Sequence, residues 1–443
     1  MKIALLTGGQ DPPYARGLLR ELLARDIDVA CVGSDELANY HPGGSGRLEF
    51  HNLIGDQRPA PLVPKAWRVL RYYGRVLLFT ARTDARLFHI LWFRKFPWLE
   101  RTLLNAWFKI FRKRLVFTAH NVDDHARDGR ERHRWLDRVS LAFLYRSVNH
   151  VLVHTPRMKQ QLVQRFGIAD EKVTVVPFGI NNVVPISAMT RVAARQHLGL
   201  RSDDRILLFF GNIAPYKGVE DLVAAVARVI AEDKRVRLLL AGPIKDRSCG
   251  PYWQRVERLI EDLDVTAHVR KYIGYIPDEE VGLFFRASDV SVLPYRRIDQ
   301  SGVLALSYAQ GLPVIVADVG SLRDDVIEDE TGLIFRSGDV PDLAAAIHRY
   351  FTSNLYRNLE TQREKVHAYG VERFSWTTNA NRTHAVYAQL LGTSVNPVSR
   401  AGTADPDTEV GTALARRRAV AAQRQPRRAG IELAGSRTTE KEA

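Results

Sequence analysis

The chain has 443 residues, of which 45% are hydrophobic and 26% charged, a composition typical of a soluble globular protein with about two domains. It holds only two cysteines, Cys31 and Cys249, which excludes a disulfide framework and favours a reducing cytoplasm. A strand pattern follows Met1 directly, so we expect no signal peptide, and no apolar run approaches the ~20 residues of a membrane span. The formal net charge is +14, and residues 58–114 carry most of it, with fourteen Lys and Arg against two acidic residues.

The first part of the chain alternates strand and helix patterns. An apolar strand is predicted at 3–7, followed by the loop GGQDPPYARG, a helix rich in leucine and a second strand at 27–32; further strands are predicted at 115–119, 150–155 and 172–179. This alternation predicts a doubly wound α/β domain over residues 1–183. Gly8 and Gly9 let the backbone approach a ligand, but they do not form a GxGxxG motif, and we favour a tight strand-to-helix turn.

Residues 64–114 combine aromatic and basic side chains at helical spacing. The apolar positions are Trp67, Leu70, Tyr73 and Leu77, then Trp98, Leu99, Leu103, Trp107 and Ile110, with Lys and Arg between them. One interpretation is that residues 58–114 bind an anionic membrane surface, with the rings in the interface and the cations among the headgroups. The other is that the apolar faces are core and the cations are solvated. We expect no nucleic-acid binding, because the segment lacks a recognised reader motif.

The second part alternates more strictly. We predict a linker at 184–199 and a parallel-sheet domain at 200–365, beginning with the apolar strand 205–212. Within it, a strand at 290–293, the loop YRRIDQSG, a helix at 303–310 and a strand at 313–317 form a βαβ unit. The loop lies at the carboxyl edge of the sheet, and the N–H groups of Ser301, Gly302 and Val303 would point out of the helix start, where a phosphate binds well.

Two further features concern the histidines and the end of the chain. The strand at 115–119 ends at His120, which would face a cleft between the domains; a lone histidine is more often structural, but this position favours a role in the site. His125 and His133 lack metal-ligand spacing with it, so we predict no metal site and no cofactor. Residues 393–443, rich in Arg, Ala and Gly, are expected to be a disordered tail.

Several landmarks carry a resemblance to a known family. They are FFGNIAPYKGVEDL, LLLAGP, VRKYIGYIPDEEVGLFFRASDVSVLPY, SGVLALSYAQGLPVIVADVGSLRDDV, ETGLIF and FSWTTNANRTHAVYAQLL, in this order. Together they resemble the retaining glycosyltransferases of family 4, over almost the whole chain to about residue 392. The resemblance implies the GT-B fold, in which two Rossmann-like doubly wound parallel-sheet domains face each other across a cleft. It also implies a nucleotide diphosphate sugar donor bound mostly by the second domain, and a final helix, residues 366–392, that returns to the first domain.

The resemblance also assigns roles to residues. Lys217 stands at the position of the phosphate-binding lysine, and Gly302 and Val303 supply backbone donors. The remaining matches imply that Tyr275 and Ile276 hold the base, that Gly8 and Gly9 belong to the loop over the phosphates, and that His120 contacts the transferred sugar. The expected catalytic set is thus His120, Asp299 and Lys217, and the expected donor-binding set is Gly8, Gly9, Asn212, Lys217, Tyr275, Ile276, Gln300, Ser301, Gly302, Val303 and Ser307.

Two departures from the family pattern matter. Asn212 stands where the family has an arginine before the lysine. The family's two-glutamate motif is reduced to Asp299 at its first position and to Leu306 or Ser307 at its second, where ribose would be bound. The retaining outcome is therefore an expectation from the resemblance alone.

The sequence thus predicts a cytoplasmic enzyme, peripheral at the inner face of the cell membrane if residues 58–114 bind lipid. It would move a hexose from a nucleotide diphosphate sugar to a polysaccharide or a lipid-linked glycan. Two alternatives stay open: a catalytically weak GT-B partner protein in a glycan-assembly complex, and a GT-B sugar-nucleotide epimerase.

Overall fold

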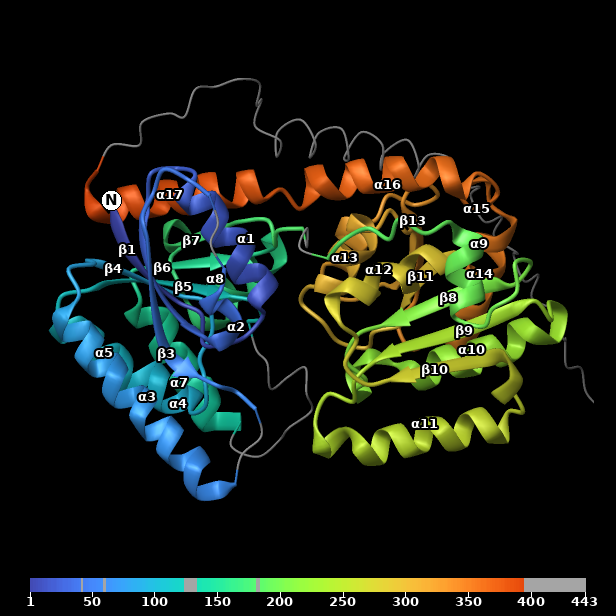
Figure 1. Cartoon of the computed structure of the whole chain (residues 1–443), viewed down its shortest axis with the longest axis horizontal. Coiled ribbons are helices and arrows are strands. Elements are labelled where there is room, and N and C mark those ends of the chain that lie inside the picture. The colour runs from blue at the N-terminus through green and yellow to red at the C-terminus, as the bar shows by residue number, and fades with distance from the viewer. Residues whose placement is uncertain (41–42, 59–60, 123–133, 181–183, 394–443) are drawn as a thin grey trace, which may run out of the picture. The chain divides into compact units, whose positions relative to one another are not determined.

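The computed structural model describes residues 1–40, 43–58, 61–122, 134–180 and 184–393. His125, His133 and the predicted tail from residue 394 onward lie outside these described residues. Within them the chain forms two parallel sheets covered by helices (Figure 1), so the predicted α/β architecture with two doubly wound sheets is confirmed.

The first sheet has seven parallel strands in the order β3-β2-β1-β4-β5-β6-β7. The strands are β1 (Lys2–Leu6), β2 (Asp28–Ser34), β3 (Leu48–Gly55), β4 (Leu87–Ile90), β5 (Arg114–Ala119), β6 (His150–Val153) and β7 (Val173–Val175). The connecting helices are α1 (Pro12–Leu23), α2 (Asp35–Ala38), α3 (Leu62–Arg82), α4 (Pro97–Leu99), the π-helix η1 (Glu100–Leu104), α5 (Asn105–Ile110), α7 (Arg134–Ser147) and α8 (Pro156–Phe166). The central strands are apolar on both faces because helices cover both sides of a parallel sheet.

The second sheet has six parallel strands in the order β10-β9-β8-β11-β12-β13. They are β8 (Arg205–Phe210), β9 (Val236–Gly242), β10 (Val269–Ile273), β11 (Val290–Leu293), β12 (Val314–Ala317) and β13 (Gly332–Phe335). Its helices are α10 (Val219–Glu232), α11 (Gly250–Asp262), α12 (Asp278–Ala287), α13 (Gly302–Ala309), α14 (Val340–Thr352) and the short α15 (Asn354–Arg357). In both sheets the strand order reverses direction between two neighbouring strands, β1 and β4 or β8 and β11, and such a switch point is where open α/β sheets bind ligands.

A buried ion network fixes the segment that leads into the second sheet. Helix α9 (Arg191–His197) lies within the predicted linker, and both Arg191 and Arg195 pair with Asp289, which is fully buried. The Asp289 carboxylate also accepts from the backbone N–H of Ile206 at 2.7 Å. Because a buried carboxylate must be paired, this network ties α9 to the start of β8.

The last helix packs against the first sheet's helices. Helix α16 (Leu359–Arg373) lies against α13, and α17 (Trp376–Leu391) continues from it along α1 (Figure 1). The Trp376 indole Nε1–H donates to the carbonyl of Ile180 at 2.7 Å. A Cβ atom added at Gly17 or Gly179 would lie 2.3 Å or 2.5 Å from the Trp376 ring, so only glycine at both positions admits this ring.

The helices of residues 62–110 expose part of their apolar surface. On α3 the core contacts come from Tyr72 and Val76, whereas Trp67 and Leu70 are each 64% exposed. Trp98, Leu103 and Ile110 are also exposed. Leu77 is exposed as well, so the interpretation that these apolar residues are core is wrong for six of the nine positions. No helix in the described part of the chain is both long and apolar enough to cross a membrane.

Candidate functional site

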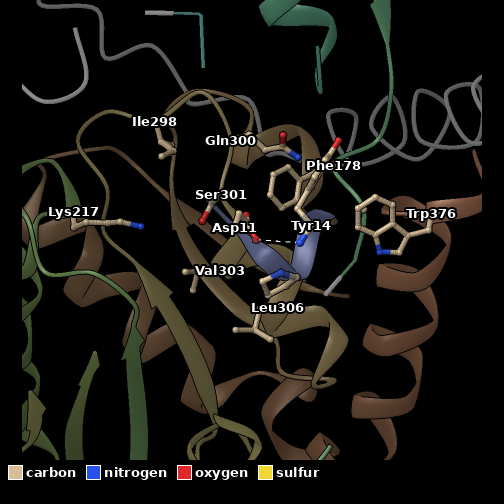
Figure 2. Close-up of a pocket in the computed structure, with 13 residues that line it drawn as sticks. Asp11, Tyr14, Phe178, Lys217, Ile298, Gln300, Ser301, Val303, Leu306 and Trp376 are labelled. Carbon is tan, nitrogen blue, oxygen red and sulfur yellow. Dashed lines mark hydrogen bonds between the residues drawn. The ribbon is translucent and has the colours of Figure 1, made fainter. Parts of the chain in front are cut away.

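A cavity of about 280 Å³ lies where the first segment of α1, the start of α17 and the loops of the second sheet meet (Figure 2). It is lined by Asp11, Pro13, Tyr14, Phe178, Gly179, Lys217, Ile298, Gln300, Ser301, Gly302, Val303, Leu306 and Trp376. Five predicted site residues, Lys217 and Gln300 to Val303, are thus brought together by the fold. They come from the loops after β8 and β11 and from the start of α13; β8 and β11 are the two strands at the switch point of the second sheet.

Lys217 supplies the cation of this cavity. It ends a 3₁₀ turn, Pro215–Lys217, between β8 and α10, and Gly218 follows at φ 64°. A Cβ at Gly218 would lie 2.1 Å from the Pro294 carbonyl oxygen, so glycine is required for this close approach. The Lys217 side chain is 6% exposed, and its Nζ lies 3.7 Å from the centre of the Tyr295 ring. The aromatic ring stabilises a cation that is largely withdrawn from water.

The start of α13 supplies hydrogen-bond donors. Ser301 caps the helix, its Oγ accepting from the backbone N–H of Leu304 at 3.4 Å. The N–H groups of the first helical residues have no partner within the helix and carry the positive end of its dipole. The Gln300 Oε1 is buried without a hydrogen-bond partner among the described residues. The cavity wall therefore joins one ammonium group to a set of backbone donors, which suits an anion.

Other cations near the cavity are used structurally. Arg296, in the loop after β11, donates to both carboxylate oxygens of Asp221 at 2.9 and 2.7 Å and pairs with Glu220. The Nζ of Lys245 lies 5.1 Å from the centre of the Tyr216 ring. Neither cation is among the lining residues, so Lys217 is the single basic side chain that lines the cavity in the described part of the chain.

The first-sheet side of the cavity is aromatic, with one carboxylate. Asp11 caps α1, and its Oδ1 accepts from the backbone N–H of Tyr14 at 3.2 Å, the dashed line in Figure 2. The Tyr14 ring lies 5.0 Å from the Trp376 ring and 5.4 Å from the Phe178 ring. Burial raises the pKa of the Tyr14 hydroxyl above its usual range, so it stays neutral and a hydrogen-bond donor.

His120 lies in a neighbouring cavity and does not line the Lys217 cavity. This first-domain cavity, about 270 Å³, is lined by Gln10, Leu91, Trp92, Phe93, Arg94, Pro97, Arg101, Phe117, Thr118, His120, Asn121, Val122, Leu141 and Tyr145. The imidazole of His120 stacks on Trp92 with ring centres 3.9 Å apart and packs edge-on against Tyr14 at 4.8 Å. Burial, and then the neighbouring His154, hold the pKa of His120 well below its usual value, so the ring is neutral at pH 7.

Asp299 is engaged with the first domain. Its Oδ2 accepts from the backbone N–H of Val122 at 2.9 Å, and its own carbonyl accepts from the Ser321 N–H and hydroxyl. Nearby, Arg157 of α8 pairs with Asp324 at 3.5 Å. Asp299 does not line the cavity with Lys217, although its neighbours Ile298 and Gln300 do. The structure thus shows a contact between domains at this carboxylate.

The remaining predicted residues lie outside the lining of the cavity. They are Gly8, Gly9, Asn212, Tyr275, Ile276 and Ser307. Gly8 and Gly9 have φ of 61° and 71°, and a Cβ at Gly8 would lie 2.5 Å from the Trp92 carbonyl oxygen, so the turn itself requires glycine. Tyr275 is 81% exposed. The Ser307 hydroxyl is fully buried and donates to the Val303 carbonyl within α13, whereas Leu306 faces the cavity.

Sequence reasoning missed the first-sheet side of the cavity. Asp11 and Tyr14 stand in the DPPY segment directly after a strand end, which is a usable signal. Phe178 falls within the strand predicted at 172–179, but β7 ends at Val175. Trp376 reaches the cavity because α17 packs on α1; the return of this helix was expected, but the place of Trp376 in the cavity wall was not. In the described part of the chain, no group of three His, Cys, Asp or Glu residues is placed to hold a metal ion.

Comparisons with known proteins identify the family. Residues 13–182 match the family model described as Glycosyltransferase Family 4, and residues 191–370 match the model described as Glycosyl transferases group 1. The chain belongs to the group 1 glycosyltransferase family. The second of these models covers Lys217 and the start of α13, and the first covers Tyr14 and His120. Residues from both sides of the cavity therefore lie within the segments that match the family models.

Relatives of this family-4 chain include several bacterial proteins. It is 31% identical over 250 residues to D-inositol 3-phosphate glycosyltransferase of Streptomyces bingchenggensis, covering 55% of this chain and 54% of that protein. It is 27% identical over 352 residues to the protein of the same name from Nocardia farcinica, covering 77% and 74% of the two chains. The chain spans about half the length of the Streptomyces relative that it matches.

Solved structures show the same GT-B fold. Sucrose-phosphate synthase from Thermosynechococcus elongatus aligns with a TM-score of 0.70 at 24% identity, covering 89% of this chain and 100% of that one. Anabaena HepE in complex with UDP-glucose aligns with a TM-score of 0.65 at 18% identity, covering 88% and 100%. At these identities the likeness concerns the fold, and the predicted GT-B class is confirmed.

Proposed function

We propose that this protein transfers a hexose from a nucleotide diphosphate sugar to a polysaccharide or lipid-linked glycan, with retention at the anomeric carbon. The observation that carries the proposal is the cavity wall formed by Lys217 and the start of α13. A diphosphate concentrates negative charge, and this wall offers one ammonium group and several oriented N–H groups in a partly buried setting. The family membership and the UDP-glucose named for the HepE structure support a nucleotide sugar as the donor.

The wall is suited to a leaving diphosphate. Negative charge on the departing oxygen grows as the glycosidic bond breaks, so contacts from Lys217 and the α13 N–H groups strengthen toward the transition state. The aromatic side, with Tyr14, Phe178 and Trp376, excludes water and provides flat faces for a sugar or base. Asp299, expected to be catalytic, here binds the Val122 amide, which supports a role in holding the two domains together.

A ligand panel tests the proposal. UDP-, GDP-, ADP- and dTDP-sugars are added to the purified full chain, and melting temperature and release of the nucleoside diphosphate are recorded. A ligand present at a hundred times its dissociation constant adds about 2.7 kcal/mol to stability. We expect one nucleotide class to stabilise the protein and to turn over with a glycan acceptor. No stabilisation by any of the four classes would contradict the proposal.

The same assay separates the two alternatives. A catalytically weak partner protein binds the donor without turnover, and an epimerase converts the donor without any acceptor. The presence of Leu306 where the family pattern has an acid is the observation that favours a weak enzyme, because an apolar side chain lines the cavity at this point. Product analysis with the donor alone, and then with acceptor, assigns one of the three activities.

The exposed face of residues 58–114 supports a membrane-bound acceptor. Trp67, Leu70 and Ile110 are exposed beside exposed cations that include Arg71 and Lys109. Helix α7, which packs against α4 and the π-helix, adds exposed Trp135, Leu136, Val139 and Phe143. Exposed aromatic and aliphatic side chains among cations fit the interface of an anionic bilayer, and we propose that this face binds the inner surface of the cell membrane peripherally.

Vesicle co-sedimentation tests this binding. Replacing exposed Arg71, Lys109 and Arg112 with alanine should weaken binding to anionic vesicles by about 1 kcal/mol each at most. Binding of the native protein to these vesicles should fall as salt is added. Lys113 is a poor choice, because its Nζ donates to the Thr83 and Ala85 carbonyls at 2.8 and 2.9 Å. Trp67→Ser removes an exposed ring from this face and should also weaken binding; Leu263→Ser, at an exposed site at the end of α11, is its control. Equal binding to neutral and anionic vesicles would contradict the proposal.

A further inference from the structure

Two histidines lie side by side at the carboxyl edge of the first sheet. His120 directly follows β5, and His154 directly follows the neighbouring strand β6. The two rings are joined by a hydrogen bond of 2.9 Å between His154 Nε2 and His120 Nδ1. On its other side, His154 Nδ1 lies 3.3 Å from the backbone carbonyl oxygen of Val176. The parallel register of β5 and β6 therefore places His120, His154 and the Val176 carbonyl in one hydrogen-bonded row.

The carbonyl group determines which atom donates in each hydrogen bond of this row. A carbonyl oxygen only accepts, so His154 must carry its proton on Nδ1 and donate it to Val176. The Nε2 atom of a neutral His154 then has a lone pair and accepts. Consequently, the proton of His120 sits on Nδ1, and the lone pair of His120 sits on Nε2. Each ring is held in one tautomer by the group behind it.

The last nitrogen of this row, His120 Nε2, is buried and is left without a hydrogen-bond partner among the described residues. The ring lines the first-domain cavity and is fixed by stacking on Trp92, with an angle of 1° between the two planes. An unpartnered buried acceptor is costly, which is the usual mark of a group whose partner is a ligand or water.

We propose that His154 is a positioning residue that holds His120 in the Nδ1–H tautomer, so that His120 Nε2 accepts a hydrogen bond from a substrate hydroxyl group. The ligand class is a carbohydrate or other polyol, because a neutral imidazole lone pair recognises a neutral O–H donor. The substrate part of this inference rests on the proposed function; the tautomer part does not.

The surroundings of both imidazole rings favour their neutral forms. Burial lowers the pKa of His154 to about 4 and, with the charge that His154 would carry, also lowers the pKa of His120. A proton on His154 Nε2 would face the N–H of His120 and break the bond between the rings. The neutral forms are thus the ones that the packing and the Val176 carbonyl both favour.

The tautomers are tested without any substrate. Long-range ¹H–¹⁵N NMR of the histidine side chains in the full chain distinguishes a protonated from an unprotonated ring nitrogen. We expect His120 to be Nδ1–H in the native protein and in His154→Gln, whose side-chain oxygen accepts in place of Nε2. We expect His154→Leu to lose this preference. An Nε2–H form of His120 in the native protein, or an unchanged His120 in His154→Leu, would overturn the proposal.

Kinetics then test the consequence for substrate. His154→Leu should lower kcat/KM by about tenfold, as expected when a buried hydrogen bond is misdirected, and His154→Gln should recover most of it. In a His120→Ala background, His154→Leu should have no further effect on kcat/KM. An equal loss in both backgrounds would mean that His154 acts on folding and not through His120. Absence of any turnover in the native protein would count against the proposed function, and the NMR result would still decide the tautomer.

Discussion

The carboxyl edges of the two sheets offer different chemistry. At the second sheet, Lys217 and the start of α13 present a fixed positive charge and backbone donors. At the first sheet, His120 and His154 are neutral and packed among Trp92 and Tyr14. The difference matches the two parts of a sugar nucleotide, since a diphosphate is an anion and sugar hydroxyls are neutral. In the proposed reaction, each sheet would therefore contact one part of the donor.

The largest expected effect concerns the residue that joins the two regions. Trp376 is 5% exposed, fills the space beside Gly17 and Gly179, and lines the cavity. Trp376→Ala should lower the free energy of unfolding by about 4 kcal/mol, because it leaves a cavity and removes the bond to Ile180. Urea denaturation measures this loss. Trp135→Ala, at a 67% exposed site, is the control and should change stability by less than about 0.5 kcal/mol.

The next effect tests the charged side of the comparison. Lys217→Ala should lower kcat by about a hundredfold, on the order of 3 kcal/mol, with a smaller effect on donor affinity. Lys217→Arg should recover only part, because a planar fork replaces a compact ammonium. Lys245→Ala removes an equal charge outside the cavity lining and should cost less than about tenfold. Steady-state kinetics measures both variants; an equal loss of kcat in Lys217→Ala and Lys245→Ala would contradict the role of Lys217 in the cavity.

The neutral side of the comparison predicts a pH dependence of stability. Burial lowers the pKa of His89 to about 3 and that of His154 to about 4, whereas an unfolded histidine titrates near 6.5. Between these values the unfolded chain binds more protons, so stability falls as the pH drops from about 6.5 toward 4. Each group contributes up to about 1.4 kcal/mol per pH unit. The slope of the urea midpoint against pH should therefore be shallower in His154→Gln; an identical slope would contradict a neutral His154.

The smallest effect concerns the contact between the two regions. Asp299→Asn keeps an oxygen that can accept from the Val122 N–H, so kcat should fall by less than about fivefold, or about 1 kcal/mol. Asp299→Ala removes the acceptor and should cost more. A loss of a hundredfold or more in Asp299→Asn would show that the carboxylate charge takes part in the reaction and that the contact with Val122 is secondary.

Local sequence patterns predicted the part of the site that a strand and its adjoining loop determine. The apolar strand at 290–293 and the loop before α13 pointed to Gln300 to Val303, whereas Lys217 was assigned by the family resemblance. The structure brings these residues to one cavity. Strands β3 and β4 were not predicted, since β3 carries mixed polar residues and β4 has only four residues. Helix α16 was also missed because it lacks a clear apolar face and buries Arg363.

The rest of the site depends on contacts between distant parts of the chain. Trp376 reaches the cavity through the packing of α17 on α1, and Phe178 reaches it because the chain leaves β7 early. The direction of the His120 lone pair depends on His154 and Val176, more than thirty residues further along the chain. Helical spacing alone did not show which face of α3 is buried, because an apolar face can meet either the core or another surface.

Binding of a nucleoside diphosphate and of its monophosphate, measured by calorimetry on the native chain and on Lys217→Ala, tests the charged site most directly. The pair of ligands differs by one phosphate, and the pair of proteins differs by one ammonium group, so the four affinities form a thermodynamic cycle. We expect Lys217→Ala to weaken the diphosphate about tenfold or more while leaving the monophosphate within about twofold. Equal weakening of both ligands, or of neither, would show that the diphosphate does not lie against Lys217.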